Sequence, residues 1–426
     1  MKTRNKLGLG ALVLLMGASL LAMRSHSEDR HHAAIVAAHL KLASVSTASR
    51  RDVDYRLLDA RLQQLMSKPA MVGLAVGVVE NGRITFLKGY GETLEGSGDP
   101  VTPETVFRWA SCSKGVAATM VAKLAEQGKV NLNGPVSDYA PDLKLPNGNE
   151  RLATVGDLLS HRLGLYRDAF ANKLEEGQDP SFLRTQLATL NPVCAPGTCW
   201  DYQNVAYDAS SEIVSRIMHM PYEQAVKRTL FNPIGMNDAS VSMAGLESNK
   251  SWARPHSAGG RPWPMVDTYY KVPAAAGINS NIKDMALWME AQMGEMPDVL
   301  DSRVLDTIHA PYVVTPTERA RMRKFLERLG TAWYGYGWRS YDYAGHRIIG
   351  HRGGIRGYRS LILFDPQKKS GVVALWNSDT WQPGGLEFEV MDMLYHLPFR
   401  DWMELNKNAE QSIAAADSEP DSGGPS

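Results

Sequence analysis

A serine and a lysine three residues apart form the first pattern that could do chemistry. The segment reads Ser111-Cys112-Ser113-Lys114 and leads into small residues at 115–125 that predict a buried helix. A serine at the start of a helix gains from the positive end of the helix dipole, which favours a developing alkoxide. A lysine three residues later lies on the same face, and burial lowers its pKa. We therefore predict that Ser111 is a nucleophile and that Lys114 accepts its proton.

The same spacing occurs a second time, at Ser280-Asn281-Ile282-Lys283. The pattern is therefore weak by itself, and an isolated match is usually a surface serine beside a solvated lysine. Ser280 also follows the second candidate segment, which contains Tyr202, whereas Ser111 precedes it. This order favours Ser111.

Two further segments supply polar groups. Tyr202-Gln203-Asn204 is the only Tyr-x-Asn in the chain. A phenol can relay a proton, and an amide can hold a lysine or a substrate carbonyl. His351-Arg352-Gly353-Gly354 enters a predicted strand, where two glycines let a substrate backbone approach the strand edge. Taken alone, each segment also fits an ordinary loop or turn.

The composition bounds the class of partner. Lys plus Arg and Asp plus Glu number 46 each, so no overall basic field favours nucleic acid. A small molecule or a short peptide is the expected substrate. The chain has neither paired Cys/His spacing nor a His-Glu-x-x-His motif, so we expect no metal site and no cofactor.

The strand pattern predicts one antiparallel sheet. An apolar run at 72–79, the turn Asn81-Gly82 and a returning run at 84–87 indicate a hairpin. Runs at 360–364 and 371–376 form a second hairpin that could complete the same sheet. The middle of the chain, about 131–274, has helical stretches such as 207–218 and 222–230, broken by Pro and Gly. We predict an α/β lobe, about 53–130 and 275–400, into which a mostly helical lobe is inserted.

The two ends differ from this body. Three positive charges precede an uncharged stretch at 7–23, which is typical of a signal peptide, or of a membrane anchor if residues 1–23 are not cleaved. Residues 24–52 are expected to form a linker, and 409–426 a disordered tail. The protein is therefore expected to be periplasmic or otherwise secreted, with membrane contact only through the N-terminal segment.

The three cysteines divide into a pair and a single residue. Cys194 and Cys199 flank a Pro-Gly turn, and in an oxidising compartment they form either a disulfide or two separate thiols. Cys112 lies beside the predicted nucleophile, without a neighbouring base in the sequence to activate it.

Together, the three motifs in this order resemble the penicillin-recognising serine hydrolases. This family includes class C β-lactamases, D-alanyl-D-alanine carboxypeptidases, D-aminopeptidases and esterases. The resemblance covers roughly residues 55–400 and includes the segments 155–161, 233–236 and 276–280. It implies a β-lactamase/transpeptidase-like α/β fold over 53–400, with a central antiparallel sheet flanked by helices and a mostly helical lobe.

The resemblance also implies roles for individual residues. Ser111 matches the nucleophile of the family and Lys114 its first proton acceptor, while Tyr202 matches the general base and acid. The substrate-binding positions correspond to Asn204, His351, Gly353 and Gly354, with the backbone N–H groups of Ser111 and Gly354 as the oxyanion hole.

The third motif departs from the class C pattern. A class C β-lactamase usually has Lys-Thr-Gly there, whereas this chain has His351-Arg352-Gly353. A histidine at this position is more like the D-peptidases and esterases. The expected activity is acyl transfer from a β-lactam or a D-amino-acid peptide amide. A carboxylesterase of the same fold, or a penicillin-binding receptor for cell-wall fragments that lacks catalysis, stays open.

The histidine also changes the expected charge of the site. An unperturbed imidazole has a pKa of about 6.5, so at neutral pH His351 would be mostly uncharged and would gain its charge as the pH falls. Carboxylate-bearing β-lactams should then bind weakly at neutral pH, unless Arg352 or Arg356 points into the site.

Overall fold

The computed structural model describes residues 51–406, which belong to one compact unit. The predictions for 1–23 and 409–426, and for all but the last two residues of 24–52, lie outside the described residues. Within 51–406, no helix is both long enough and apolar enough to cross a bilayer.

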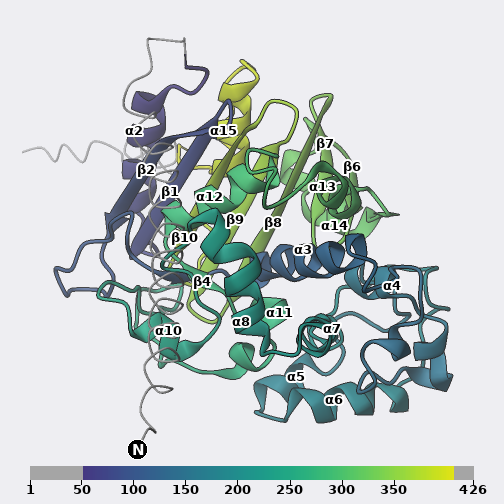
Figure 1. Cartoon of the computed structure of the whole chain (residues 1–426). Coiled ribbons are helices and arrows are strands. Elements are labelled where there is room, and N and C mark those ends of the chain that lie inside the picture. The colour runs from purple at the N-terminus through teal and green to yellow at the C-terminus, as the bar shows by residue number, and fades with distance from the viewer. Residues whose placement is uncertain (1–50, 407–426) are drawn as a thin grey trace, which may run out of the picture. The chain divides into compact units, whose positions relative to one another are not determined.

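An eight-stranded antiparallel sheet forms the centre of this unit, in the order β2-β1-β10-β9-β8-β7-β6-β5 (Figure 1). Its strands are β1 (Gly73–Glu80), β2 (Arg83–Gly91), β5 (Val313–Val314), β6 (Leu329–Tyr334), β7 (Arg339–Tyr343), β8 (His346–Ile355), β9 (Tyr358–Asp365) and β10 (Ser370–Trp376). A small second sheet joins β3 (Phe107–Arg108) to β4 (Asn279–Ser280).

Both predicted hairpins are present, and they join as expected. β1 pairs with β2 through the turn at Asn81 and Gly82, and β9 pairs with β10. β1 also pairs antiparallel with β10, with Val76 opposite Ala374, so the two hairpins share one sheet. The predicted antiparallel sheet, with both hairpins in it, is therefore confirmed.

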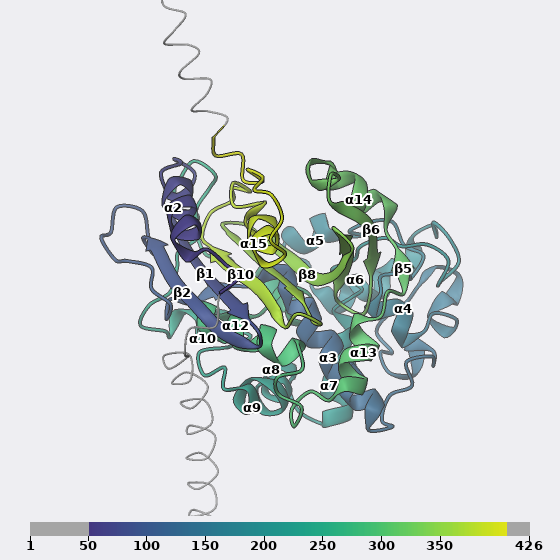
Figure 2. The ribbon, with the colours of Figure 1, turned by 90° about the horizontal axis from the view of Figure 1, so that it is seen from above.

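Helices cover both faces of the sheet. They are α2 (Tyr55–Met66), α3 (Ser113–Glu126), α4 (Val155–Leu159), α5 (Ala171–Glu175), α6 (Pro180–Gln186), α7 (Ala209–Met218), α8 (Tyr222–Val226), α9 (Asn232–Ile234), α10 (Met243–Glu247), α11 (Pro273–Ala276), α12 (Ile282–Gln292), α13 (Ser302–His309), α14 (Pro316–Arg321) and α15 (Leu386–Leu394). Figure 2 shows α2 and α15 on one face and α12 and α3 on the other.

Two buried clusters separated by the sheet explain why β1 is apolar throughout. Leu74, Val76 and Val78 belong to the cluster under α2 and α15, whereas Ala75 and Val79 belong to the cluster that contains α3 and α12. Successive side chains of a strand point to opposite faces, so a strand covered on both sides has few exposed positions.

The helical stretches predicted at 207–218 and 222–230 also exist, with shorter bounds. α7 begins at Ala209, and α8 ends at Val226 and continues as a π-helical turn over Lys227–Phe231. In Figure 1, α5, α6 and α7 lie on the side of α3 away from the sheet. The division into two lobes with the predicted boundaries stays a prediction.

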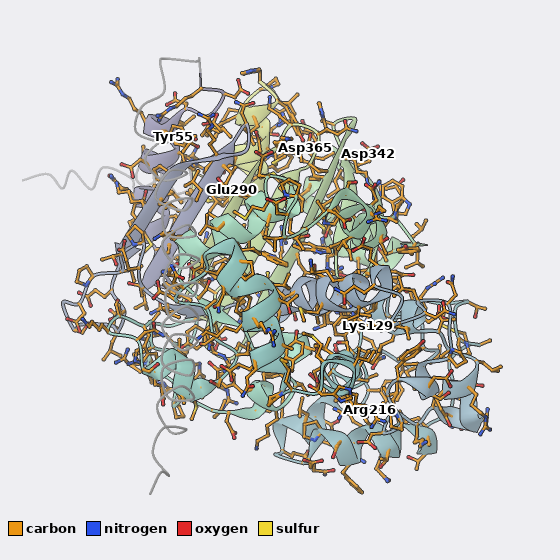
Figure 3. The ribbon with its side chains drawn as sticks, in the orientation of Figure 1. Tyr55, Lys129, Arg216, Glu290, Asp342 and Asp365 are labelled. Carbon is orange, nitrogen blue, oxygen red and sulfur yellow. A yellow bond between two sulfur atoms is a disulfide. The ribbon has the colours of Figure 1, made fainter. Side chains whose placement is uncertain are left out.

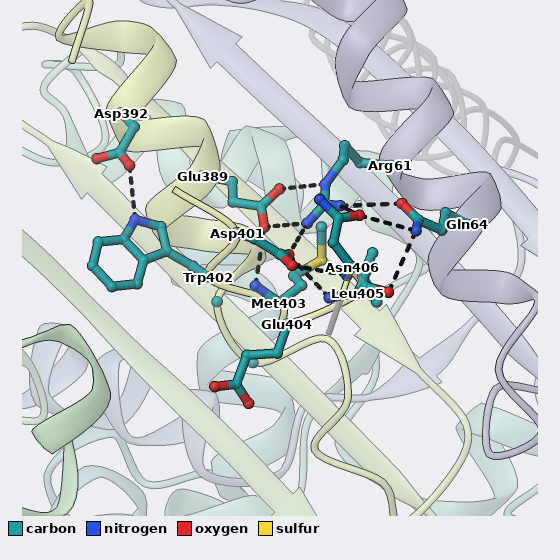
Figure 4. Close-up of polar contacts among 12 residues, drawn as sticks. Arg61, Gln64, Glu389, Asp392, Asp401, Trp402, Met403, Glu404, Leu405 and Asn406 are labelled. Carbon is teal, nitrogen blue, oxygen red and sulfur yellow. Dashed lines mark hydrogen bonds and ion pairs between the residues drawn. The ribbon is translucent and has the colours of Figure 1, made fainter. Parts of the chain in front are cut away.

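The C-terminal segment is tied to α2 by a buried ion pair (Figure 4). Arg61 donates from Nε and Nη2 to the two carboxylate oxygens of Glu389 on α15, over 3.0 and 2.8 Å. Glu389 also accepts from the Met403 backbone N–H, and Arg61 contacts Asp401. The side chains of Arg61 and Glu389 are only 6% and 1% exposed.

We expect Arg61→Leu to lower the free energy of unfolding by about 3–5 kcal/mol, because it leaves a buried carboxylate without its cation. The control is Arg216→Leu, which removes a side chain that is 57% exposed and is labelled in Figure 3. That change should cost under about 1 kcal/mol. Urea denaturation of both variants measures the difference, and equal stabilities would contradict the structural role of the Arg61 pair.

Candidate active site

Ser111 lies on a tight turn between the small sheet and α3. Residues Ala110–Cys112 form one 3-10 turn, and the Trp109 backbone N–H before it bonds to the Ile278 carbonyl over 2.8 Å. Ala110 is buried and has a φ of +48°, a left-handed conformation that costs a residue with a side chain roughly 1–3 kcal/mol. Ser111 itself is half-buried and lines a cavity of about 520 Å³.

Lys114, in the first turn of α3, is completely buried. Its ammonium nitrogen lies 2.7 Å from Asn204 Oδ1, 2.9 Å from the Ala275 carbonyl oxygen and 3.4 Å from Ser111 Oγ. Burial lowers the pKa of Lys114 from 10.5 to about 7, against the opposing effect of Asp168. Near neutral pH, a large fraction of Lys114 is therefore an uncharged amine that can accept a proton.

The partners of Lys114 are themselves held in place by further hydrogen bonds. The side chain of Asn204 donates from Nδ2 to Asp168 Oδ1 over 3.0 Å, which leaves its oxygen facing the lysine. On the other side, the buried carboxylate of Asp208 accepts from the Ala274 backbone N–H over 3.0 Å and pairs with Arg184. This contact fixes the short helix α11, which presents the Ala275 carbonyl.

Tyr202 and Asn204 are positioned by a loop closed by a disulfide. Cys194 and Cys199 are bonded, with their Cα atoms 6.2 Å apart. The loop runs along 161–164 through hydrogen bonds from the backbone N–H groups of Val193, Gly197 and Asp201 to carbonyls of that segment. Of the two states that the sequence leaves open for these cysteines, the structure contains the disulfide.

The Tyr202 hydroxyl is buried and has no hydrogen bond of ordinary geometry within residues 51–406. Burial raises the pKa of Tyr202 above its usual 10, while Arg339 and the nearby Ser111 hydroxyl act in the opposite direction. The Lys114 nitrogen lies 4.6 Å from the centre of its ring. The phenol is therefore neutral at physiological pH, and between these two groups the better proton acceptor is Lys114.

His351 lies inside β8 and not at its entry, and both of its ring nitrogens are occupied. Nδ1 lies 2.8 Å from the carbonyl oxygen of Arg352, and Nε2 lies 3.2 Å from the Tyr334 hydroxyl. That hydroxyl is also 3.2 Å from His161 Nε2, and His161 Nδ1 accepts from the backbone N–H of Gln203.

The two ends of this chain of hydrogen bonds determine its direction. The carbonyl of Arg352 can only accept, so His351 carries its proton on Nδ1 and accepts from Tyr334 at Nε2. The N–H of Gln203 can only donate, so His161 carries its proton on Nε2 and donates to Tyr334. Both imidazoles are therefore neutral and both are satisfied without a ligand.

The expected protonation of His351 near pH 6.5 is wrong. Burial lowers its pKa well below 6.5, and the charges of Arg339 and Lys114 lower it further. The sequence suggested an imidazole that gains its charge as the pH falls, because it does not show that His351 is 3% exposed and lies near Arg339 and Lys114.

Gly353 of the third motif lets β8 approach the Ser111 turn closely. A Cβ atom at Gly353 would lie 2.2 Å from the Trp109 carbonyl oxygen and 3.0 Å from the Ser111 backbone nitrogen, so a side chain cannot be accommodated there. Gly354 is exposed and lines a second cavity, of about 200 Å³. The oxyanion-hole assignment of the Ser111 and Gly354 N–H groups stays a prediction.

Ser280 and Cys112, the other candidate residues of the sequence analysis, are buried and contact other parts of the protein. The Ser280 hydroxyl accepts from Trp109 Nε1 over 2.8 Å and donates to the Asn281 carbonyl. Cys112 is a buried free thiol whose pKa is raised to about 12 by burial. Within residues 51–406, no group of His, Cys, Asp and Glu side chains is arranged to hold a metal ion.

Sequence reasoning missed the arginines of the large cavity. Arg167, Arg321 and Arg339 line it together with Glu318, Tyr202 and His351. The cluster of basic residues at 319–323 was the only signal in the sequence. Of the arginines that the sequence suggested, Arg352 lines this cavity but is paired with Glu387, and Arg356 lines the second cavity.

Comparisons with known proteins agree with this geometry. A family model described as Beta-lactamase matches residues 58–391. Unguisins hydrolase ungD' of Aspergillus campestris is 27% identical over 74% of this chain, and Protein flp of Staphylococcus aureus (strain COL) is 22% identical over 75%. The chain spans only about three fifths of the length of these curated relatives, 60% and 62%.

A solved structure is similar over most of the chain. The octameric penicillin-binding protein homologue from Pyrococcus abyssi superposes with a TM-score of 0.72 at 25% identity, over 81% of this chain and 78% of that one. Since the family model covers well over half of the 426 residues and the sheet and its helices follow the same fold, the chain belongs to the Beta-lactamase family, a family of serine hydrolases.

Proposed function

We propose that this chain is an exported hydrolase that forms an acyl-enzyme on Ser111 and acts on a β-lactam or a D-amino-acid peptide amide. The observation that carries the proposal is the environment of Lys114. A buried amine with a pKa of about 7 lies 3.4 Å from a half-buried serine hydroxyl. This pairing gives a serine a base of suitable strength at neutral pH.

In the acylation step, Ser111 Oγ forms a bond to the carbonyl carbon of the substrate, and the hydroxyl proton passes to the Lys114 amine. The negative charge that develops on the carbonyl oxygen is stabilised by the backbone N–H groups of Ser111 and Gly354. The bond to the leaving nitrogen or oxygen then breaks, and the leaving group takes a proton that Lys114 returns through the Tyr202 hydroxyl. Water releases the acyl group in a second step and restores the Ser111 hydroxyl.

Asn204 serves this step by orienting the amine. Its side-chain oxygen accepts from Lys114, while its nitrogen is held by Asp168. His351 has a structural role here, whereas its position in the family motif implies a role in substrate binding. Because both of its ring nitrogens bond within the protein, it supports Tyr334 and β8, and Gly353 gives the strand its close approach to Ser111.

A carboxylesterase of the same fold is the second candidate. It is favoured by the neutral third motif, since His351 supplies no positive charge of the kind that a lysine would give. A non-catalytic receptor is disfavoured because the buried, neutral amine beside Ser111 serves no purpose in binding alone. The proposal of export rests on the charged and apolar N-terminal sequence and on the disulfide between Cys194 and Cys199, which suits an oxidising compartment.

We expect Ser111→Ala to abolish covalent labelling by a fluorescent penicillin and by a fluorophosphonate, because the acylated oxygen is removed. Ser280→Ala is the matched control, since it changes the other serine of a Ser-x-x-Lys pattern. Labelling is measured on gels and by intact mass. Undiminished labelling of the Ser111 variant by both probes would refute the assignment.

The pKa of Lys114 predicts how the reaction depends on pH. The pKa is lowered to about 7, so the uncharged, proton-accepting form gains population as the pH rises through 7. We therefore expect the rate of fluorophosphonate labelling to rise by about tenfold or more between pH 5.5 and 8.5.

Asp168→Asn should shift the pH dependence of labelling, and the same experiment measures that shift. The carboxylate of Asp168 raises the pKa of Lys114, and an asparagine there can still accept from Asn204. The half-point of the labelling profile should therefore move to lower pH in this variant. A wild-type profile that is flat over this range would contradict the assignment of Lys114 as the base.

A further inference from the structure

The cavity wall beside Tyr202 consists of guanidinium groups that belong to none of the three motifs. Arg167, Arg321 and Arg339 each donate to the carboxylate of Glu318, over 3.0, 2.7 and 2.9 Å. All four residues, which we call the guanidinium cluster, line the cavity that contains Ser111. We infer that the guanidinium cluster binds a carboxylate carried by the leaving group of the substrate.

The cluster has unused hydrogen-bond donors. A guanidinium carries five N–H donors, and within residues 51–406 the side chain of Arg339 makes one hydrogen bond, from Nη1 to Glu318. The side chain is only 13% exposed, so little water competes for its N–H donors with a carboxylate that reaches it through the cavity. The planar fork of an arginine suits bidentate binding of a carboxylate.

Glu318 holds the arginines close together. Three guanidiniums repel one another, and a shared carboxylate, itself 11% exposed, offsets that repulsion without using all their donors. Because Glu318 has charged partners on both oxygens, its pKa lies below its usual value despite burial. It therefore stays ionised and does not take a proton from a bound substrate.

Apart from Glu318, the carboxylates beside the cluster do not line the cavity. Asp168 lies 3.5 Å from Arg167 Nε, and the charge of Asp201 also interacts with Arg167 and Arg321. These two carboxylates balance much of the total charge, but neither lines the cavity. Arg352 does line it and is neutralised by Glu387. A ligand in the cavity therefore meets guanidinium groups on this wall.

The position of Tyr202 indicates which part of the substrate carries the carboxylate. The guanidinium carbons of Arg167 and Arg339 lie 5.5 and 5.6 Å from the centre of the Tyr202 ring. In the proposed function, on which this inference rests, Tyr202 delivers the proton to the leaving group. The leaving group departs on that side, next to the guanidinium cluster. The substrates favoured are thus amides or esters whose leaving group bears an acid, such as a C-terminal amino acid or the ring nitrogen of a β-lactam.

Two aryl methylphosphonate esters test the inference on the full chain. They differ only in the leaving group, which is either 3-carboxyphenol or the neutral 3-carbamoylphenol. Both transfer the same phosphonyl group to Ser111, and intact mass gives the second-order rate of each reaction. The wild type should react faster with the carboxylate ester, and Arg339→Gln should reduce that preference by about 10- to 100-fold.

Two more variants complete the design. Arg167→Gln, at a side chain that is 35% exposed, should also reduce the preference for the carboxylate ester. If Arg339→Gln does not fold, this variant alone tests whether the guanidinium cluster binds the carboxylate. Arg216→Gln, at an exposed arginine outside the cavity, should leave the preference as in the wild type. A wild type without preference for the carboxylate, or a preference unchanged in both cavity variants, overturns the inference alone. Failure of Ser111 to react with either ester overturns the proposed function as well.

Discussion

The burial of one amine is the constraint on which the rest of the site depends. An ammonium group withdrawn from water loses its hydration, and this loss moves the pKa of Lys114 into the neutral range. Such burial requires that α3, which carries the lysine, packs tightly against its neighbours. Small residues of α3 allow this packing, since a Cβ at Gly115 would lie 2.6 Å from the Trp338 ring. The Asn204 and Ala275 oxygens can accept hydrogen bonds from the amine in either protonation state, whereas the Ser111 hydroxyl accepts from the ammonium and donates to the neutral amine.

The same principle accounts for the histidines near the amine. His161 and His351 are buried within reach of Lys114 and Arg339, and each would be destabilised as a cation. The Tyr334 hydroxyl between them lets both rings stay neutral with every nitrogen satisfied. The His161 ring also packs 4.4 Å from that of Tyr202, so the hydrogen-bonded rings support the tyrosine that completes the site.

The sequence predicted those features that depend on neighbours along the chain. The turn at Asn81 and Gly82, the apolar runs of the strands and the Ser111–Lys114 spacing are local patterns, and each has its expected place in the fold. The arginines around Glu318 come from three segments, residues 167, 316–321 and 339, whose meeting is set by long-range sheet pairing. The charge of His351 depends likewise on burial by distant residues, so its type alone did not show that the ring stays uncharged as the pH falls through 6.5.

In the proposed reaction, Arg339 would connect the binding of an anion to the strength of the base. Its charge lowers the pKa of Lys114 and also that of Tyr202. A carboxylate bound to the guanidinium would offset part of that charge, and the pKa of Lys114 would rise as a result. The amine would then hold the Ser111 proton more firmly once the substrate is in place, and it would be a weaker base in the empty site. In the proposed reaction, substrate recognition and proton transfer would therefore be coupled through one guanidinium, although Arg339 belongs to none of the three motifs.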